Sequence, residues 1–268
     1  MLADRYDAFL FDLDGVLYRG SAPVPHAAEA LTSLREAGKG IAFVTNNSAS
    51  TPDTVAERLR SVGVRADPSE VETSAITTAH LLASRAVRSA FVVGEEGVRS
   101  ALGAQGIEIH DDPSGGVDVV VVGLDREVDY AKLRTASILV QRGAALVATN
   151  PDGSFPAADG EVWPGAGALL AAIEATTGVK AEVVGKPEPP ILEAALRRAG
   201  GGVPLLVGDR LDTDIAGAER LGWDSLLVLT GITTPQELTR SPINPTYVGD
   251  DLRVLSQDPP RRGPRPQA

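Results

Sequence analysis

Two aspartates near the start of the chain have the type and spacing that suit chemistry on charged groups. Asp12 and Asp14 are separated by one apolar residue and directly follow the apolar run 8–11. Such a run, ended by acids and a glycine, predicts a buried strand and a loop, with alternation sending both side chains the same way. Two close carboxylates repel each other unless a cation or a shared proton relieves them, and Mg²⁺ prefers hard oxygen ligands. The pair is therefore either a cation site or a simple loop cap.

Polar residues also follow the apolar run 40–44. Thr45, Asn46 and Asn47 offer hydroxyl and amide donors that could bind an anion. Taken alone, the same cluster is more typical of a turn or an N-cap before a helix that begins near Pro52.

A lysine and an acid-rich loop stand later in the chain. Lys186 lies between a glycine and a proline, and the proline stiffens the segment, so the lysine ammonium is either a fixed positive charge or a solvated surface group. Asp209, Asp212 and Asp214 closely follow the apolar run 205–207, and three acids in a short loop are costly unless water or a cation surrounds them. Asp212 could instead cap the helix that follows. The order of the four patterns along one chain is more specific than any one of them.

Composition removes several other kinds of chemistry. The 268 residues include no cysteine, which excludes disulfides, thiolate zinc sites, iron–sulfur clusters and cysteine nucleophiles. The three histidines form no HExxH pattern, which argues against a histidine-rich metal site. A net charge of −11 disfavours nucleic acid as a partner. The N-terminus lacks the pattern of a signal peptide, and no apolar run approaches the roughly 18 residues of a membrane span, so we expect a cytoplasmic protein.

Strand and helix patterns alternate along the chain, which predicts an α/β fold of parallel sheets flanked by helices. In such sheets ligands bind at the carboxyl ends of the strands, where the polar residues described above are found. The composition of residues 258–268, rich in proline and arginine, predicts a disordered tail. The expected strands are 8–11, 40–44, 91–94, 117–123, 145–148, 204–207 and 225–229. The expected helices are 27–37, 130–142, 166–177, 189–199 and 215–221, with another that opens at 51–53.

Taken together, the four patterns resemble the motifs of the haloacid dehalogenase superfamily of phosphohydrolases. Segments 11–17, 44–48, 185–187 and 207–215 are similar, in that order, to its first four motifs. The Thr-Asn-Asn run and a Thr-Asn-Pro-Asp run at 149–152 further resemble the NagD-like subfamily, in which a large α/β cap is inserted between the second and third motifs. The resemblance extends from Asp7 to about Leu255.

This resemblance implies the organisation of the chain. The two ends, residues 1–80 and 181–257, would form a Rossmann-like catalytic core, and residues 81–180 would form the inserted cap. The interval between Thr45 and Lys186 is long enough to hold a complete second α/β unit, which agrees with this division.

The resemblance also implies a role for each catalytic residue. Asp12 would be the nucleophile that forms an aspartyl-phosphate, and Asp14 the general acid and then the general base. The presence of Asp14 favours phosphate esters over carbon–halogen bonds, because a halide leaves without protonation. The residues that would bind phosphoryl oxygens are Thr45, Asn46, Asn47 and Lys186.

A Mg²⁺ ion would be the cofactor. The resemblance implies that Asp12, the main-chain carbonyl of Asp14 and Asp209 hold it. Asp214 would act through a metal-bound water or orient the surrounding shell. Asp212 is a less favoured candidate for such a role.

The expected function is Mg²⁺-dependent hydrolysis of a small phosphorylated metabolite, with glycerol 3-phosphate or 2-phosphoglycolate preferred because the overall pattern looks closest to that branch. Nucleoside monophosphates such as UMP and pyridoxal phosphate are the alternative substrates, and a phosphomutase is a sibling enzyme. A catalytically silent anion-binding or regulatory module is the alternative from another class. No nucleic acid or membrane is expected as a partner. The sequence leaves the oligomeric state open, with a homodimer through the cap as one option.

Overall fold

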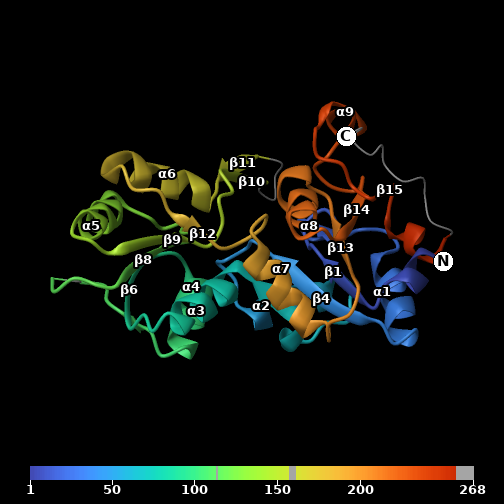
Figure 1. The fold of residues 1–268 in the computed structure, drawn as a ribbon, viewed down its shortest axis with the longest axis horizontal. Helices are drawn as coiled ribbons and strands as arrows, with labels where there is room; N and C mark the ends of the chain where they lie inside the picture. The colour runs from blue at the N-terminus through green and yellow to red at the C-terminus, as the bar shows by residue number, and fades with distance from the viewer. Residues whose placement is uncertain (113, 157–160, 258–268) are drawn as a thin grey trace. The chain divides into compact units, whose positions relative to one another are not determined.

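The computed structural model describes residues 1–112, 114–156 and 161–257, and these form two compact units. The first unit comprises residues 1–45, 53–72 and the chain from Lys186 onward. The second comprises residues 46–52 and 73–185. The chain therefore crosses between the units several times, and residues distant in sequence meet within each unit (Figure 1).

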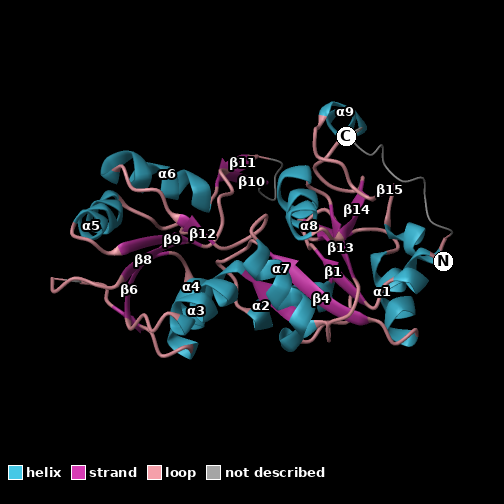
Figure 2. Cartoon of the chain, viewed as in Figure 1, coloured by secondary structure: helices cyan, strands magenta, loops and turns pink. Residues whose placement is uncertain are grey.

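The first unit is built on a six-stranded sheet with the order β15-β14-β13-β1-β4-β5. The strand β1 pairs in parallel with β13 on one side and with β4 on the other, and Figure 2 shows these strands as one layer. The strands are β1 (Ala8–Phe11), β4 (Gly40–Thr45), β5 (Val71–Thr73), β13 (Pro204–Gly208), β14 (Asp224–Val228) and β15 (Tyr247–Gly249). The helices are α1 (Ala27–Glu36), α2 (Pro52–Ser61), α7 (Pro189–Arg198), α8 (Ala216–Leu221) and α9 (Pro235–Arg240). Short elements complete the unit: strands β2 (Tyr18–Arg19) and β3 (Ala22–Pro23) and single turns of helix at Leu2–Arg5, Pro68–Glu70, Leu211–Ile215 and Leu252–Ser256.

Both faces of this sheet are buried, which explains why its strands read as continuous apolar runs. In β1, Phe9 and Phe11 belong to the core that contains the apolar sides of α1 and α2. Alternate residues of the same strand, such as Leu10, belong to a second core with α7 and α8. Burial on both faces holds β1 in the middle of the sheet, and whatever follows its carboxyl end lies between β13 and β4.

The second unit repeats this plan on a smaller scale. Its five-stranded sheet has the order β12-β9-β8-β6-β7. Helices α3 and α4 pack with one face of the sheet, and α5 and α6 pack with the other (Figure 1). The strands are β6 (Ser89–Val93), β7 (Glu108–Ile109), β8 (Val119–Val122), β9 (Ala145–Ala148) and β12 (Glu182–Val183), with a separate hairpin of β10 (Ser154–Pro156) and β11 (Val162–Pro164). The helices are α3 (Ser74–Ser84), α4 (Glu96–Ala104), α5 (Tyr130–Gln141) and α6 (Ala166–Thr177).

The units divide at other residues than the predicted core and cap. The boundary predicted after residue 80 falls inside α3, and the second unit also takes in residues 46–52 and runs on to Gly185. The reason lies in packing: Ala79 and Leu82 of α3 share a core with Val98 of α4, so this helix cannot be split between two units.

The predicted α/β class is confirmed, and most predicted elements differ from the observed ones by two residues or fewer. The sequence analysis did not identify α3, α4, α9 or the short strands at the sheet edges. The predicted tail, 258–268, lies outside the described residues. Among the residues described, none of the helices is both long enough and apolar enough to cross a membrane.

Candidate active site

The site is assembled at the carboxyl ends of β1 and β13 in the first unit. Phe11, the last residue of β1, pairs with Val207 of β13. The N–H of Asp12 donates to the Val207 carbonyl at 2.9 Å, so the ladder continues for one residue past the strand. Asp209 follows β13 in the same way. The register of these two strands therefore brings together two carboxylates that stand far apart in the sequence.

Lys186 connects the carboxylates. Its side chain is buried, and Nζ donates to Asp12 Oδ1 at 2.5 Å and to Asp214 Oδ1 at 2.8 Å. Nζ also donates to the Val44 carbonyl at 3.3 Å. Burial alone would lower the pKa of Lys186, but the negative charges of Asp12 and Asp214 outweigh it and raise the pKa above its ordinary value. Lys186 is therefore a fixed positive charge, and the alternative of a solvated surface lysine is excluded.

Asp209 is 1% exposed and only partly satisfied. Its Oδ2 accepts a hydrogen bond from the Ile232 N–H at 2.7 Å, whereas its Oδ1 is buried without a hydrogen-bond partner among the described residues. A Cβ at Gly15 or Gly231 would collide with this carboxylate, so both glycines are needed to make room for it. Burial, reinforced by the charge of Asp214, raises the pKa of Asp209 to about 7.

Three carboxylates form one cluster. Single oxygens of Asp12, Asp209 and Asp214 all lie within 4.8 Å of one another. Burial raises the pKa of Asp12; Lys186 opposes this rise, while the other two carboxylates add to it. One lysine thus faces three buried acids, which leaves this described cluster short of positive charge.

Asp14 is more exposed than Asp12. Its carboxylate lies 3.9 Å from the Arg58 guanidinium, which sits over the ring of Tyr18 at 4.2 Å. Burial raises the pKa of Asp14, while Arg58 and Lys186 oppose this rise; 54% of the side chain remains exposed. After β1 the chain turns, with the Leu13 carbonyl accepting the N–H groups of residues 16–18. That alternation sends both aspartates the same way stays a prediction.

The predicted anion-binding run is divided between the two units. Thr45 is buried at the end of β4 in the first unit, whereas Asn46 and Asn47 belong to the second. Within that unit Asn46 Nδ2 donates to Asp152 Oδ2 at 3.1 Å, and Asn47 Oδ1 accepts the Ala49 N–H at 2.9 Å. Asn46 therefore makes a long-range contact and Asn47 a turn contact within the second unit.

Asp212 lies apart from the cluster. Both of its carboxylate oxygens accept hydrogen bonds from the Arg210 guanidinium, at 3.0 and 2.8 Å, and 67% of its side chain is exposed. Asp214, its neighbour two positions on, is fully buried and accepts the Arg210 N–H at 3.2 Å.

Sequence reasoning missed several groups at the site. Arg58 lies in the last turn of the amphipathic helix α2, where a basic residue is common, so nothing in its local pattern marks it. The Ile232 N–H and the Val44 carbonyl are main-chain groups, which a motif search does not see. Gly231 carries a weak signal, since a glycine soon after β14 marks a place where the backbone and another group come close.

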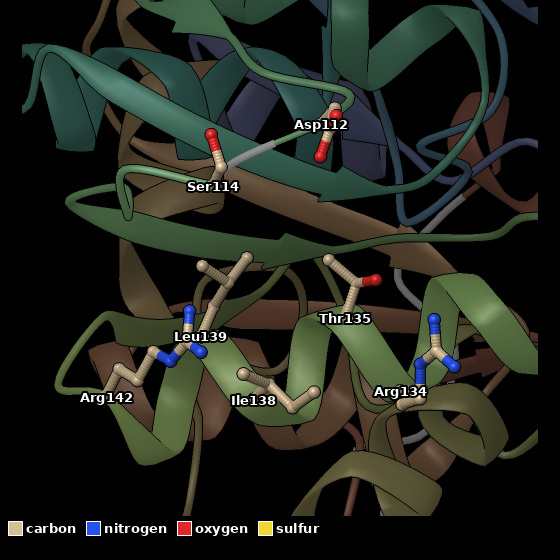
Figure 3. A pocket seen from close by; sticks show the side chains of 7 residues that line it. All are labelled: Asp112, Ser114, Arg134, Thr135, Ile138, Leu139 and Arg142. Carbon is tan, nitrogen blue, oxygen red and sulfur yellow. The ribbon is translucent and has the colours of Figure 1, made fainter.

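A separate hollow of about 340 Å³ lies in the second unit, between residues near 112–114 and α5. Figure 3 shows Arg134 and Arg142 at opposite ends of its helical wall, with Ile138 between them. Both arginines are exposed, and none of the predicted site residues is among those described as lining it. The hollow therefore adds nothing to the chemistry of the carboxylate cluster.

Comparison with known proteins agrees with the geometry. A family model described as haloacid dehalogenase-like hydrolase matches residues 9–108, and a HAD-hydrolase-like model matches residues 183–255. An acid sugar phosphatase from Staphylococcus saprophyticus is 39% identical over 95% of this chain and 98% of its own length. The chain belongs to the haloacid dehalogenase-like hydrolases.

Solved structures of similar proteins agree with this family assignment. A glycerol phosphate phosphatase from Mycobacterium tuberculosis, crystallised with magnesium, is 37% identical with a TM-score of 0.91, and the match covers 96% of this chain and 78% of that one. A 4-nitrophenylphosphatase from Thermotoga maritima is 33% identical with a TM-score of 0.89, over 96% and 99% of the two chains. This haloacid dehalogenase-like hydrolase is thus a phosphoric monoester hydrolase.

Removing the Lys186 charge should destabilise this hydrolase. Lys186→Met leaves Asp12 and Asp214 buried without their cation, which typically costs about 3–5 kcal/mol. Lys180→Met is the matched control, because Lys180 also pairs with a carboxylate, at 2.6 Å, but is 85% exposed; its loss should cost less than about 1 kcal/mol. Urea unfolding in EDTA measures both, and equal stabilities for the two variants would contradict the interpretation.

The pKa of Asp209 makes a prediction with a defined sign. In the metal-free protein a carboxyl group whose pKa rises from 3.8 to about 7 on folding destabilises the fold above pH 7. Asp209→Asn should therefore stabilise the metal-free protein at pH 8 by up to about 4 kcal/mol. The gain should shrink as the pH falls from 7 and vanish near pH 4. Urea unfolding in EDTA across this range tests it, and a variant less stable than wild type at pH 8 would refute the assignment.

Proposed function

We propose that this chain is a Mg²⁺-dependent phosphatase that hydrolyses small phosphate monoesters through an aspartyl-phosphate on Asp12. The observation that carries the proposal is the buried contact of Lys186 with Asp12 beside the partly satisfied Asp209. An oriented carboxylate, a fixed cation and an acidic cluster able to hold a divalent metal are the parts that phosphoryl transfer through a covalent intermediate uses here.

The residues present fit a divalent cation. Asp12, Asp209 and Asp214 would hold it, since their oxygens lie within 4.8 Å of one another and Asp209 Oδ1 is buried without a described partner. Carboxylates are the hard ligands that Mg²⁺ prefers. The expected main-chain ligand, the carbonyl of Asp14, would add to this set. When bound, the cation would supply positive charge that offsets the charge of the phosphoryl group.

Asp12 would act as the nucleophile. A carboxylate oxygen attacks phosphorus, a phosphorus–oxygen bond to Asp12 forms, and the bond to the leaving alcohol breaks. Lys186 orients this carboxylate through Oδ1, and its positive charge opposes the rise in the pKa of Asp12 that burial causes. In the second step water attacks phosphorus, and the bond to Asp12 breaks to release phosphate.

Asp14 would move the protons. It would protonate the leaving alkoxide in the first step and then accept a proton from the attacking water. A general acid at neutral pH needs a raised pKa, and the direction of the shift at Asp14 agrees with this. Its partial exposure and its distance from the cluster suit a group that must reach the leaving group rather than the metal.

Hydrogen bonds to the phosphoryl oxygens would come from Thr45, at the end of β4, and from Lys186, in the loop before α7. Asn46 and Asn47 remain candidates for the same role, next to Thr45 in the chain.

The relatives favour a polyol or sugar phosphate as substrate. The names of similar proteins are acid sugar phosphatase and glycerol phosphate phosphatase. Of the substrates expected from the sequence, glycerol 3-phosphate therefore gains support, and 2-phosphoglycolate, UMP and pyridoxal phosphate rank below it.

Asp12→Asn should lower kcat by more than about 10³-fold, because an amide cannot form the covalent intermediate. Asp212→Asn is the matched control, since it removes an exposed acid from the loop that follows β13, and it should retain activity within about twofold. Phosphate release from glycerol 3-phosphate, a hexose phosphate, 2-phosphoglycolate, UMP and pyridoxal phosphate is measured with Mg²⁺ and with EDTA.

Three outcomes would count against the proposal. Phosphate release that persists in EDTA would contradict the metal requirement. Near-normal turnover by a folded Asp12→Asn variant would contradict the assignment of Asp12 as nucleophile. A preference for UMP or pyridoxal phosphate would keep the reaction and overturn the substrate class.

A further inference from the structure

The main-chain carbonyl of Asn46 is held by two side chains of the second unit. Asn150 Nδ2 donates to it at 2.7 Å and Ser74 Oγ donates at 2.8 Å. Ser74 is fully buried and Asn150 is 4% exposed. A carbonyl oxygen has two lone pairs, so these two donors can satisfy both of them and fix the direction of this peptide group.

Neither donor is explained by local structure. The N-cap of α3 is Thr73, whose hydroxyl accepts the Ile76 N–H at 3.2 Å, so the helix does not need the Ser74 hydroxyl as a cap. Asn150 does make a turn contact, through Oδ1 and the Asp152 N–H at 3.1 Å. Its amide nitrogen is used instead for Asn46, 104 positions away.

The rest of the segment 46–50 is also held by hydrogen bonds to other parts of the second unit. The Ala49 carbonyl accepts the Gly97 N–H at 2.9 Å, and the Ser48 hydroxyl accepts the Leu124 N–H at 3.2 Å. A Cβ at Gly97 or at Gly123 would collide with this segment. Hydrogen bonds and close packing within the second unit therefore fix the residues that follow Thr45.

The turn at Thr149 and Asn150 also binds Gly185, at a second point where the chain passes between the units. The Thr149 carbonyl accepts the Gly185 N–H at 2.8 Å, and Thr149 precedes Asn150. A Cβ at Gly185 would meet both the Thr149 carbonyl and Asn46 Oδ1. One short turn therefore holds the residue after Thr45 and the residue before Lys186.

We propose that Ser74 and Asn150 are positioning residues for phosphate binding. They fix the carbonyl of Asn46, the residue that follows Thr45 in the chain, and the same turn binds Gly185, the residue that precedes Lys186. This inference rests on the proposed function, in which Thr45 and Lys186 bind the phosphoryl group.

Ser74→Ala tests the inference against Ser137→Ala. Both serines are buried in the second unit and both donate to a main-chain carbonyl, but Ser137 bonds Leu133 within α5, at 2.9 Å. We expect Ser74→Ala to lower kcat/KM and to raise the inhibition constant of inorganic phosphate, each by about tenfold, since small misplacements are costly in phosphoryl transfer. Ser137→Ala should leave both constants within about twofold of wild type. Its melting temperature should fall by about as much as that of Ser74→Ala, because each variant loses one buried hydrogen bond.

Asn150→Asp is the second variant, because it keeps the acceptor for the Asp152 N–H and removes the donor to Asn46. It should shift both constants in the same direction as Ser74→Ala. An inhibition constant does not depend on the fraction of folded enzyme, so a purely structural role would leave it unchanged.

Inhibition constants for both variants equal to that of Ser137→Ala, in a wild type that hydrolyses esters, would overturn this inference alone. A wild type that releases no phosphate from any ester would overturn the proposed function and this inference with it.

Discussion

The ammonium of Lys186, held between the buried carboxylates of Asp12 and Asp214, is the interaction on which the rest of the site depends. Its three members come from the residue after β1, from the helical turn that follows β13 and from a segment that re-enters the first unit after more than a hundred residues. A buried charge without its partner is strongly destabilising, so no member is tolerated alone. The parallel register of β1 and β13 and the burial of both sheet faces are what hold the carboxylates close enough for one lysine to serve both.

The surrounding backbone leaves the negative charge of Asp209 only partly compensated. Gly15 and Gly231 leave room for Asp209 but provide no group to satisfy its second oxygen. Burial of this oxygen destabilises the metal-free site, and a bound cation would relieve the penalty, so stability is given up for function. The overall charge of −11 is a poor guide to such a site, because the local balance among three acids and one lysine decides what binds.

Sequence reasoning reached the α/β class and the apolar strands, because strands buried on both faces leave continuous apolar runs in the sequence. It also singled out Asp12 and Asp209, which directly follow strands, and Lys186 and Asp214, which lie in a loop and a helical turn further along the chain. It did not predict that Asp14 is half-exposed, because exposure depends on how the chain turns after β1. It missed Arg58, because only the fold brings this residue close to Asp14. It could not assign α3 to a unit, since that depends on which core the helix joins.

The central claim, that Asp12 carries the phosphoryl group during turnover, is tested most directly by trapping the intermediate in an Asp14→Asn variant. With 4-nitrophenyl phosphate the leaving group needs no proton, so the first step should proceed while the attack of water is slowed. Rapid acid quenching and peptide mass spectrometry should then find a phosphoryl group on Asp12. Turnover of the ester with no label on Asp12, or with the label on another residue, would contradict the account.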